Sequence, residues 1–224
     1  MSTKRLTEHI VQFTRFAFVN AYLVREADGL TLVDTTLPRS SDALLEVARA
    51  TGGSIKRIAL THGHGDHVGS LDALRAQLAP GVQVLMGEPD ARIHAGEQVV
   101  DGKLTGSWPK LATVPEARLA HDDMVGSLRV IETPGHTPGH VSFLDTRDGT
   151  LIAGDVFTSI GGVATTSARN LVFPLATMGT YDRRANLRSA RALRELEPSL
   201  MVVGHGPPVH APTAAMDRAI AHAR

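Results

Sequence analysis

The chain has 224 residues, of which 42% are hydrophobic and 21% charged, and this composition predicts one soluble domain over residues 1–224. Its 23 Lys and Arg residues balance its 23 Asp and Glu residues, so the charge indicates no nucleic-acid partner. The absence of Cys excludes disulfides, thiolate metal sites and a cysteine nucleophile. No signal-peptide core and no run of 18 apolar residues is present, so we expect a cytoplasmic protein without membrane contact.

The N-terminal third predicts strands followed by alternating helices and strands. Residues that favour β-structure predict strands at 10–18, 21–24 and 30–33. Ser40 then precedes a helix that Gly52 ends. Further along, a strand at 55–60, a helix and a strand at 82–86 are expected. The apolar residues that recur at helical spacing in this second helix are Val68, Leu71, Leu74 and Leu78.

Two irregular stretches, 95–127 and about 156–180, interrupt the remainder of the chain. The regular segments between and after them are strands at 128–131, 141–144, 151–153 and 200–203, and helices at 182–197 and 212–223. Alternation of this kind predicts an α/β fold.

The most informative motif is His62-Gly63-His64-Gly65-Asp66-His67, directly after the strand at 55–60. Imidazole and carboxylate groups are common ligands of Zn²⁺. Three other candidates also follow strands, namely His136, Asp155 and His205. Because open α/β sheets collect ligands at the carboxyl ends of their strands, we expect all these side chains to meet at one metal site.

Together, these motifs resemble those of the metallo-β-lactamase superfamily. The matching segments are His62-x-His64-x-Asp66-His67, Thr133-Pro134-Gly135-His136-Thr137, Ala153-Gly154-Asp155 and Val203-Gly204-His205-Gly206. The resemblance implies an αββα sandwich, with two mixed β-sheets flanked by helices. It also implies two divalent metal ions between the sheet edges. We expect Zn²⁺ first, with Fe, Mn or Co as alternatives.

The same resemblance implies a role for each ligand. His62, His64 and His136 would hold one ion, Asp66, His67 and His205 the other, and Asp155 would bridge them. A hydroxide bound to such metals attacks an electrophilic carbonyl at neutral pH. Asp66 would orient it and pass a proton to the leaving group. Asp34 matches a family position near the site, and His140 is expected to have a structural role.

The sequence therefore predicts a hydrolase acting on an ester-like bond in a lactone, thioester or related small molecule. Asp155 argues against a true β-lactamase, in which the family has Cys or Ser, and Thr158 replaces a Tyr of the best-known lactonases. A persulfide dioxygenase with one iron on His62, His136 and Asp155 is an alternative. β-Lactamase and phosphodiesterase activities are further alternatives.

Substrate contacts are expected in the two irregular stretches, because loops on a rigid scaffold commonly form specificity pockets. The candidates are Trp108, Phe157, Met178 and Tyr181. The sequence leaves the oligomeric state open, a homodimer included.

Overall fold

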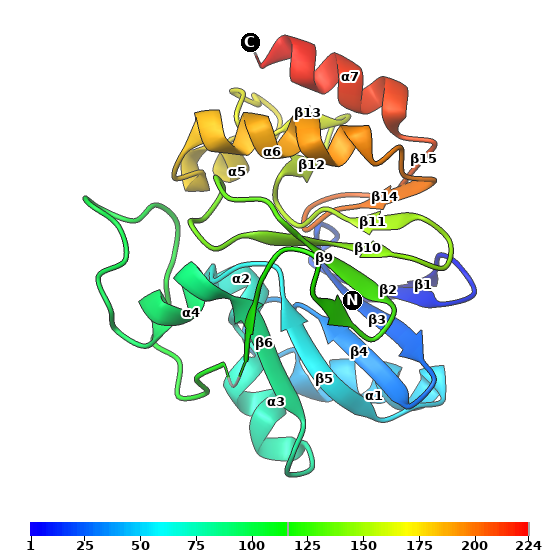
Figure 1. Ribbon diagram of the computed structural model, residues 1–224. Helices are drawn as coiled ribbons and strands as arrows, with labels where there is room; N and C mark the ends of the chain where they lie inside the picture. The colour runs from blue at the N-terminus through cyan, green and yellow to red at the C-terminus, as the bar shows by residue number, and fades with distance from the viewer. Residues whose placement is uncertain (116, 224) are drawn as a thin grey trace.

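Two β-sheets lie face to face, and helices cover the outer face of each (Figure 1). The computed structural model describes residues 1–115 and 117–223. The first sheet contains, in spatial order, β1 (Ser2–Arg5), β2 (Ile10–Arg15), β3 (Val19–Glu26), β4 (Gly29–Val33), β5 (Ile55–Leu60), β6 (Gln83–Gly87) and β7 (Ala117–Leu119). The second contains β15 (Val209–His210), β14 (Leu200–Val202), β11 (Thr150–Ile152), β10 (Val141–Asp145), β9 (Leu128–Glu132) and β8 (Met124–Val125). A separate hairpin joins β12 (Phe157–Thr158) and β13 (Ala164–Thr165).

The helices divide between the two outer faces. Those of the first half are α1 (Ser41–Thr51), α2 (Gly65–Val68), α3 (Leu71–Gln77) and α4 (Glu88–His94). Those of the second half are α5 (Pro174–Gly179), α6 (Arg183–Glu195) and α7 (Thr213–His222). In Figure 1, α1 and α3 lie below the first sheet, and α6 and α7 lie above the second. This is the expected α/β architecture of two mixed sheets flanked by helices. Within the described residues, no helix is both long and apolar enough to cross a bilayer.

Alternation of side chains along the strands explains the layers, because successive residues point to opposite faces of a sheet. In β3, Leu23 packs in a cluster with α1 and α3, whereas Tyr22 packs between the two sheets. In β11, Ile152 faces the space between the sheets and Leu151 packs with α6 and α7. The strands are thus apolar on both faces, as a strand buried between two layers requires.

Parallel pairing brings the ends of the important strands to one edge. β4, β5 and β6 are parallel neighbours in the first sheet, and β11 and β14 are parallel in the second. A hydrogen bond of 2.8 Å from the Val141 N–H to the Thr61 carbonyl joins the two sheets there. The loops after β5, β9, β11 and β14 consequently meet at this edge.

Several local predictions need correction. The strand predicted at 10–18 ends at Arg15, because Phe16 and Ala17 have φ values of 49° and 66° and turn the chain into β3. The helix expected through Leu78 is divided into α2 and α3, with Gly69 and Ser70 between them.

The irregular stretches contain short elements. β7 and β8 lie in the first, although residue 116 lies outside the described part. The second contains β12, β13 and α5. β1 and α4 were not predicted. Asp182 caps α6, accepting hydrogen bonds of 2.9 Å from the N–H groups of Arg184 and Ala185.

Candidate metal centre

The side chains expected to bind metal come from four loops at this edge of the sandwich. The run 62–67 follows β5 and continues into α2, and His136 lies between β9 and β10. Asp155 follows β11, and His205 follows β14. These side chains are buried, except that of Asp66, which is 36% exposed. The fold therefore brings all the predicted ligands into one buried cluster.

Ligand atoms within this cluster form three overlapping groups, in each of which the atoms lie within 4.8 Å of one another. The groups are His62, His64 and His136; His62, His67 and Asp155; and Asp66, His67 and His205. Asp155 Oδ2 lies 3.4 Å from Nε2 of His136, and Asp155 Oδ1 lies 3.5 Å from Nε2 of His67. The Asp155 carboxylate thus faces both ends of the cluster.

Hydrogen bonds at the outer nitrogens assign the tautomers of His64 and His136. His64 Nε2 lies 3.1 Å from the Thr105 carbonyl, which can only accept, so Nε2 carries the proton. His136 Nδ1 lies 3.0 Å from Thr180 Oγ1, whose own hydrogen is directed to backbone carbonyls. The inner nitrogens, His64 Nδ1 and His136 Nε2, then both present lone pairs, 3.1 Å apart.

Two lone pairs can lie this close together favourably only with a cation or a proton between the two nitrogens. Burial lowers the pKa of His64 to about 4 and holds the pKa of His136 well below its ordinary value. Both imidazoles are therefore neutral at pH 7, the form in which histidine binds a metal. The pair fits a metal ion better than a shared proton.

His62 and His67 are oriented in the same way from outside the cluster. Thr61 donates its hydroxyl hydrogen to Asp34 Oδ2 over 2.8 Å, so its oxygen accepts from His62 Nδ1 at 3.0 Å. His67 Nδ1 donates to the same Asp34 oxygen over 2.8 Å. The Nε2 atoms of both rings are buried and have no hydrogen-bond partner among the described residues. Asp34 therefore lies beside the cluster and fixes a ligand, as expected from its position in the sequence.

Carboxylates give the cluster its affinity for positive charge. Burial lowers the pKa of His67, but Asp155 and Asp34 outweigh it and raise that pKa to about 9. The pKa of His205 likewise rises to about 10, because Asp155 and Asp66 outweigh burial. Asp155 Oδ1 is also buried without a hydrogen-bond partner in the described residues. Buried nitrogen and oxygen atoms that have no hydrogen-bond partner and lie next to carboxylates can bind a divalent cation. Because the set contains no thiol, these N and O ligands suit Zn²⁺, Fe, Mn or Co.

His140 orients Asp155 and does not join the ligand cluster. The Asp155 N–H donates to His140 Nε2 over 3.0 Å, and His140 Nδ1 lies 2.8 Å from Thr133 Oγ1. Both ring nitrogens are thus engaged by neighbours. This agrees with the structural role expected from the sequence.

Asp90 in α4 was missed by the sequence reasoning. Its carboxylate is fully buried and accepts hydrogen bonds from Gly63 N (2.9 Å), Thr137 Oγ1 (2.6 Å) and Gly139 N (2.6 Å). Burial raises the pKa of Asp90 to about 6, although these hydrogen bonds oppose the shift. Asp90 thereby ties the loop of His62 and His64 to the loop of His136.

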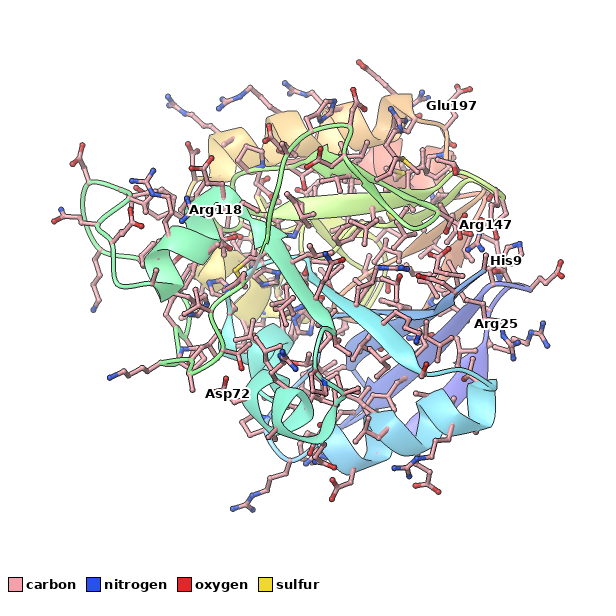
Figure 2. All side chains as sticks on the ribbon, turned by 60° about the horizontal axis from the view of Figure 1, so that its bottom comes forward. His9, Arg25, Asp72, Arg118, Arg147 and Glu197 are labelled. Atoms are coloured by element: carbon pink, nitrogen blue, oxygen red, sulfur yellow. The ribbon has the colours of Figure 1, made fainter. Side chains whose placement is uncertain are left out.

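The loop between α4 and β7 closes over His64. The Thr105 carbonyl that orients His64 also accepts from Trp108 Nε1 over 2.8 Å, and the indole stands edge-on to His64 with 5.4 Å between ring centroids. Asp72, labelled beside α3 in Figure 2, holds the far part of the loop by accepting from the N–H groups of Ala112 (3.0 Å) and Thr113 (2.8 Å). The loop is therefore built into the metal centre.

A cavity of about 650 Å³ opens directly onto the cluster. The predicted ligands that line it are His64, Asp66, His136, Asp155 and His205. Met178, a predicted substrate contact, also lines it and is 67% exposed. A reactant in this cavity would meet the ligand cluster on one side and solvent on the other.

The other proposed substrate contacts lie elsewhere. Phe157 is 0% exposed and packs in the core below α6 and α7, so its ring is a core side chain and that prediction needs correction. Tyr181 directs its hydroxyl to the Asp101 carbonyl at 3.2 Å and is not part of the cavity lining. Trp108 contacts the His64 ring edge-on and is likewise outside the cavity lining. Thr158 donates to the His205 carbonyl over 3.0 Å.

A family model described as the metallo-beta-lactamase superfamily matches residues 14–205. The chain belongs to the metallo-beta-lactamase superfamily. The matched range includes every predicted metal ligand, from His62 to His205.

Among superfamily relatives, the uncharacterized protein YobT of Bacillus subtilis (strain 168) is 40% identical over 212 residues, covering 92% of this chain and 91% of YobT. The probable metallo-hydrolase YybB of the same organism is 29% identical, with coverage of 92% and 91%. Hydroxyacylglutathione hydrolase of Rhodopseudomonas palustris (strain HaA2) is 28% identical over 62% of this chain and 48% of that enzyme. The protein is thus a metal-dependent hydrolase of the superfamily.

A solved structure has a similar fold. The crystal structure of TTHA1623 in a di-iron-bound form superimposes with a TM-score of 0.68 and 26% identity. The match covers 90% of this chain and 94% of that one.

Proposed function

We propose that this protein is a dinuclear hydrolase that cleaves an ester-like carbonyl bond in a small molecule. The position of Asp155 carries the proposal, because its two oxygens face His136 and His67 at 3.4 and 3.5 Å. A carboxylate between two imidazole groups is suited to bridge two ions. TTHA1623, whose structure contains two irons, supports the same reading.

The two ions would be held by separate sets of residues joined at Asp155. One set is His62, His64 and His136, and the other is Asp66, His67 and His205. When bound, divalent ions supply a water of lowered pKa at neutral pH and polarise a carbonyl oxygen. We expect Zn²⁺ first, and Fe, Mn or Co as alternatives.

Asp66 is our candidate for the residue that moves a proton. His205 and His67 hold its pKa below the usual range despite burial, so the carboxylate is ionised at pH 7. Its side chain lines the cavity and is 36% exposed, so it can reach both a water and a reactant. We assign Asp66 the orientation of the attacking water and the transfer of its proton to the leaving group.

The cavity lining favours an ester-like substrate over a phosphodiester. Lys110 is the only basic side chain besides histidines among the described residues of the lining. Phosphate groups are typically bound by several cationic or bidentate donors. Hydroxyacylglutathione hydrolase is named for an acyl-glutathione, and its similarity supports a thioester among the candidates. The carboxylate at Asp155 argues against a β-lactam.

Metal analysis followed by a substrate panel tests the proposal. Chelator-treated protein is reloaded separately with Zn²⁺, Fe²⁺, Mn²⁺ or Co²⁺, and its metal content is measured. It is then assayed on a lactone, a thioester, a phosphodiester, a β-lactam and, with oxygen uptake recorded, a persulfide. We expect two ions per chain and turnover of a lactone or thioester. A single iron with oxygen consumption on a persulfide would replace the proposal by the dioxygenase alternative. Activity confined to the phosphodiester or the β-lactam would also overturn it.

A further inference from the structure

Exposed apolar side chains occur in two segments that also contribute residues to the cavity lining. Among the described residues, eight large hydrophobic side chains are exposed, and five of them belong to two segments, the β2–β3 turn at 16–18 and the stretch 171–178. These five are Phe16 (63% exposed), Leu171 (85%), Val172 (65%), Leu175 (64%) and Met178 (67%). Apolar side chains that are exposed beside a cavity commonly mark a binding site. Leu175 and Met178 belong to the cavity lining itself.

An aromatic pair continues this apolar surface down to the metal centre. Phe18 and Phe173 both line the cavity and meet edge-to-face, with ring centroids 5.8 Å apart. Each also lies against the ring of His205, at centroid distances of 6.2 Å for Phe18 and 5.0 Å for Phe173. The apolar wall therefore begins at a predicted metal ligand and ends in solvent.

The segment that carries this wall is structured by hydrogen bonds. Asn170 Oδ1 accepts from the N–H groups of Val172 (2.9 Å) and Phe173 (3.1 Å), which fixes the turn before α5. Thr177 Oγ1 donates to the Ala168 carbonyl over 2.6 Å and ties α5 to the chain before that turn. The exposed side chains thus project from a fixed backbone.

The lining beside His64 is of mixed character, because Ser107 and Lys110 are polar whereas Pro109 and Leu111 are apolar. The two aromatic rings Phe18 and Phe173 lie against His205. An apolar group of a reactant would therefore find apolar contacts on the His205 side.

We propose that the substrate carries an extended apolar group, an alkyl or aryl chain, which lies along Phe18, Phe173, Leu175 and Met178 while the scissile carbonyl sits at the metal cluster. This inference rests on the proposed function. The wall selects for chain length at the His205 side, so it determines specificity without taking part in the reaction.

A homologous series of esters tests chain-length selection. The metal-loaded protein is assayed with p-nitrophenyl acetate, butyrate and octanoate. Full burial of one methylene corresponds to about a fourfold gain in affinity. Six added methylenes in a half-open groove should therefore raise kcat/KM by at least about tenfold. A flat or falling series overturns the inference and leaves the proposed function intact.

Substitutions at Leu175 and Met178 show whether this surface is responsible for the chain-length preference. In a Leu175→Ser/Met178→Ser double variant, we expect the octanoate-to-acetate ratio of kcat/KM to fall about tenfold. Met124→Ser is the control, because Met124 is 55% exposed but lies on β8, outside the cavity lining. An unchanged ratio in the double variant, or an equal fall in the control, contradicts the assignment.

Binding of hydroxamates separates this inference from the proposed reaction. Calorimetry with acetohydroxamate and octanohydroxamate on the metal-loaded protein measures the apolar preference without turnover. If octanohydroxamate binds more tightly than acetohydroxamate and the double variant loses this preference, the inference is supported. It is supported even if no ester is hydrolysed, because the absence of hydrolysis would contradict only the proposed function. Equal affinities overturn the inference. The inference is also overturned if the double variant loses self-association or binding to phosphatidylcholine vesicles while its affinity for octanohydroxamate is unchanged.

Discussion

Nδ1 of His64 and Nε2 of His136 face each other across 3.1 Å with their lone pairs directed inward. The Thr105 carbonyl and the Thr180 hydroxyl hold the two rings in this orientation from outside. Neutral imidazoles in this arrangement repel each other, and burial opposes the proton that would relieve the repulsion. The folded chain is therefore preorganised for a cation at a cost to its own stability.

Metal removal should destabilise the protein. A ligand that binds only the folded state adds about 4 kcal/mol at a free concentration 1,000 times its Kd. We expect thermal unfolding of chelator-treated protein at a clearly lower Tm, restored by Zn²⁺ or Fe²⁺. In a His64→Ala/His136→Ala variant the metal-dependent rise should be much smaller. Equal Tm values for the wild type with and without metal would show that the cluster does not bind these ions.

Gly106 is predicted to be required for metal affinity. It has a φ of +73°, and a Cβ there would lie 2.4 Å from His64 Nε2, displacing the ring from the Thr105 carbonyl. We expect Gly106→Ala to weaken metal binding about 10- to 100-fold, the usual effect of losing a partner of a ligand. Gly102→Ala is the control, because Gly102 has a φ of +95° but no atom within 4 Å of its Cβ position. Competition titration with a chromogenic chelator measures both affinities, and similar losses in the two variants would refute the steric argument.

Asp90 should make stability depend on pH. Its pKa is about 6 in the folded protein against an ordinary value of 3.8, so between these values only the folded chain holds the proton. The resulting stabilisation is present at low pH and disappears as the pH rises through 6. We expect the free energy of unfolding of the wild type, minus that of Asp90→Asn, to fall by about 2 kcal/mol between pH 4.5 and 7.

Urea unfolding of chelator-treated protein measures the difference in free energy of unfolding between the wild type and Asp90→Asn. Without metal, the histidines titrate alike in these two proteins, so their contribution to the difference cancels. Asp217→Asn, at an exposed carboxylate paired with Arg194, serves as the surface control. A difference that grows with pH would mean that the three hydrogen bonds outweigh burial.

Asp66→Asn should retain the fold and lose turnover. The amide cannot accept a proton, so kcat should fall about 10²- to 10⁴-fold, the range for a positioned acid–base group. Asp122→Asn, on an exposed carboxylate that pairs with Arg129, should leave kcat unchanged. Circular dichroism and metal content distinguish lost chemistry from lost structure. Wild-type kcat in Asp66→Asn would remove this residue from the mechanism.

The ligands could be predicted because they lie at the ends of apolar strands. His62 to His67 follow β5 at once, and Asp155 and His205 come soon after the parallel neighbours β11 and β14. The local pattern thus determines both the ligand type and the sheet edge. The layers could be predicted for the same reason, since alternating side chains in β3 and β11 face different clusters.

The partners that orient the ligands could not be predicted. Thr105 and Thr180 lie 41 and 44 residues from the histidines they contact, and both are in irregular stretches without a periodic signal. Asp90 resembles an ordinary acidic residue in the first turn of a helix until the fold buries it between two loops. Phe157 was misplaced because a strand of only two residues gives no alternation to show which way its ring points.

The Thr105 segment also connects metal uptake to the exposed surface. Thr105 accepts from His64, and its hydroxyl donates to the Gly179 carbonyl at the end of α5 over 2.6 Å. A bound ion that held His64 more firmly would also strengthen the anchoring of the loop and of α5, so metal occupancy and loop order would be linked equilibria. The exposed Lys103 and Lys110 flank this anchor. Tryptic cleavage after Lys103 and Lys110 would then report metal occupancy, with the apo chain cut sooner than the loaded one.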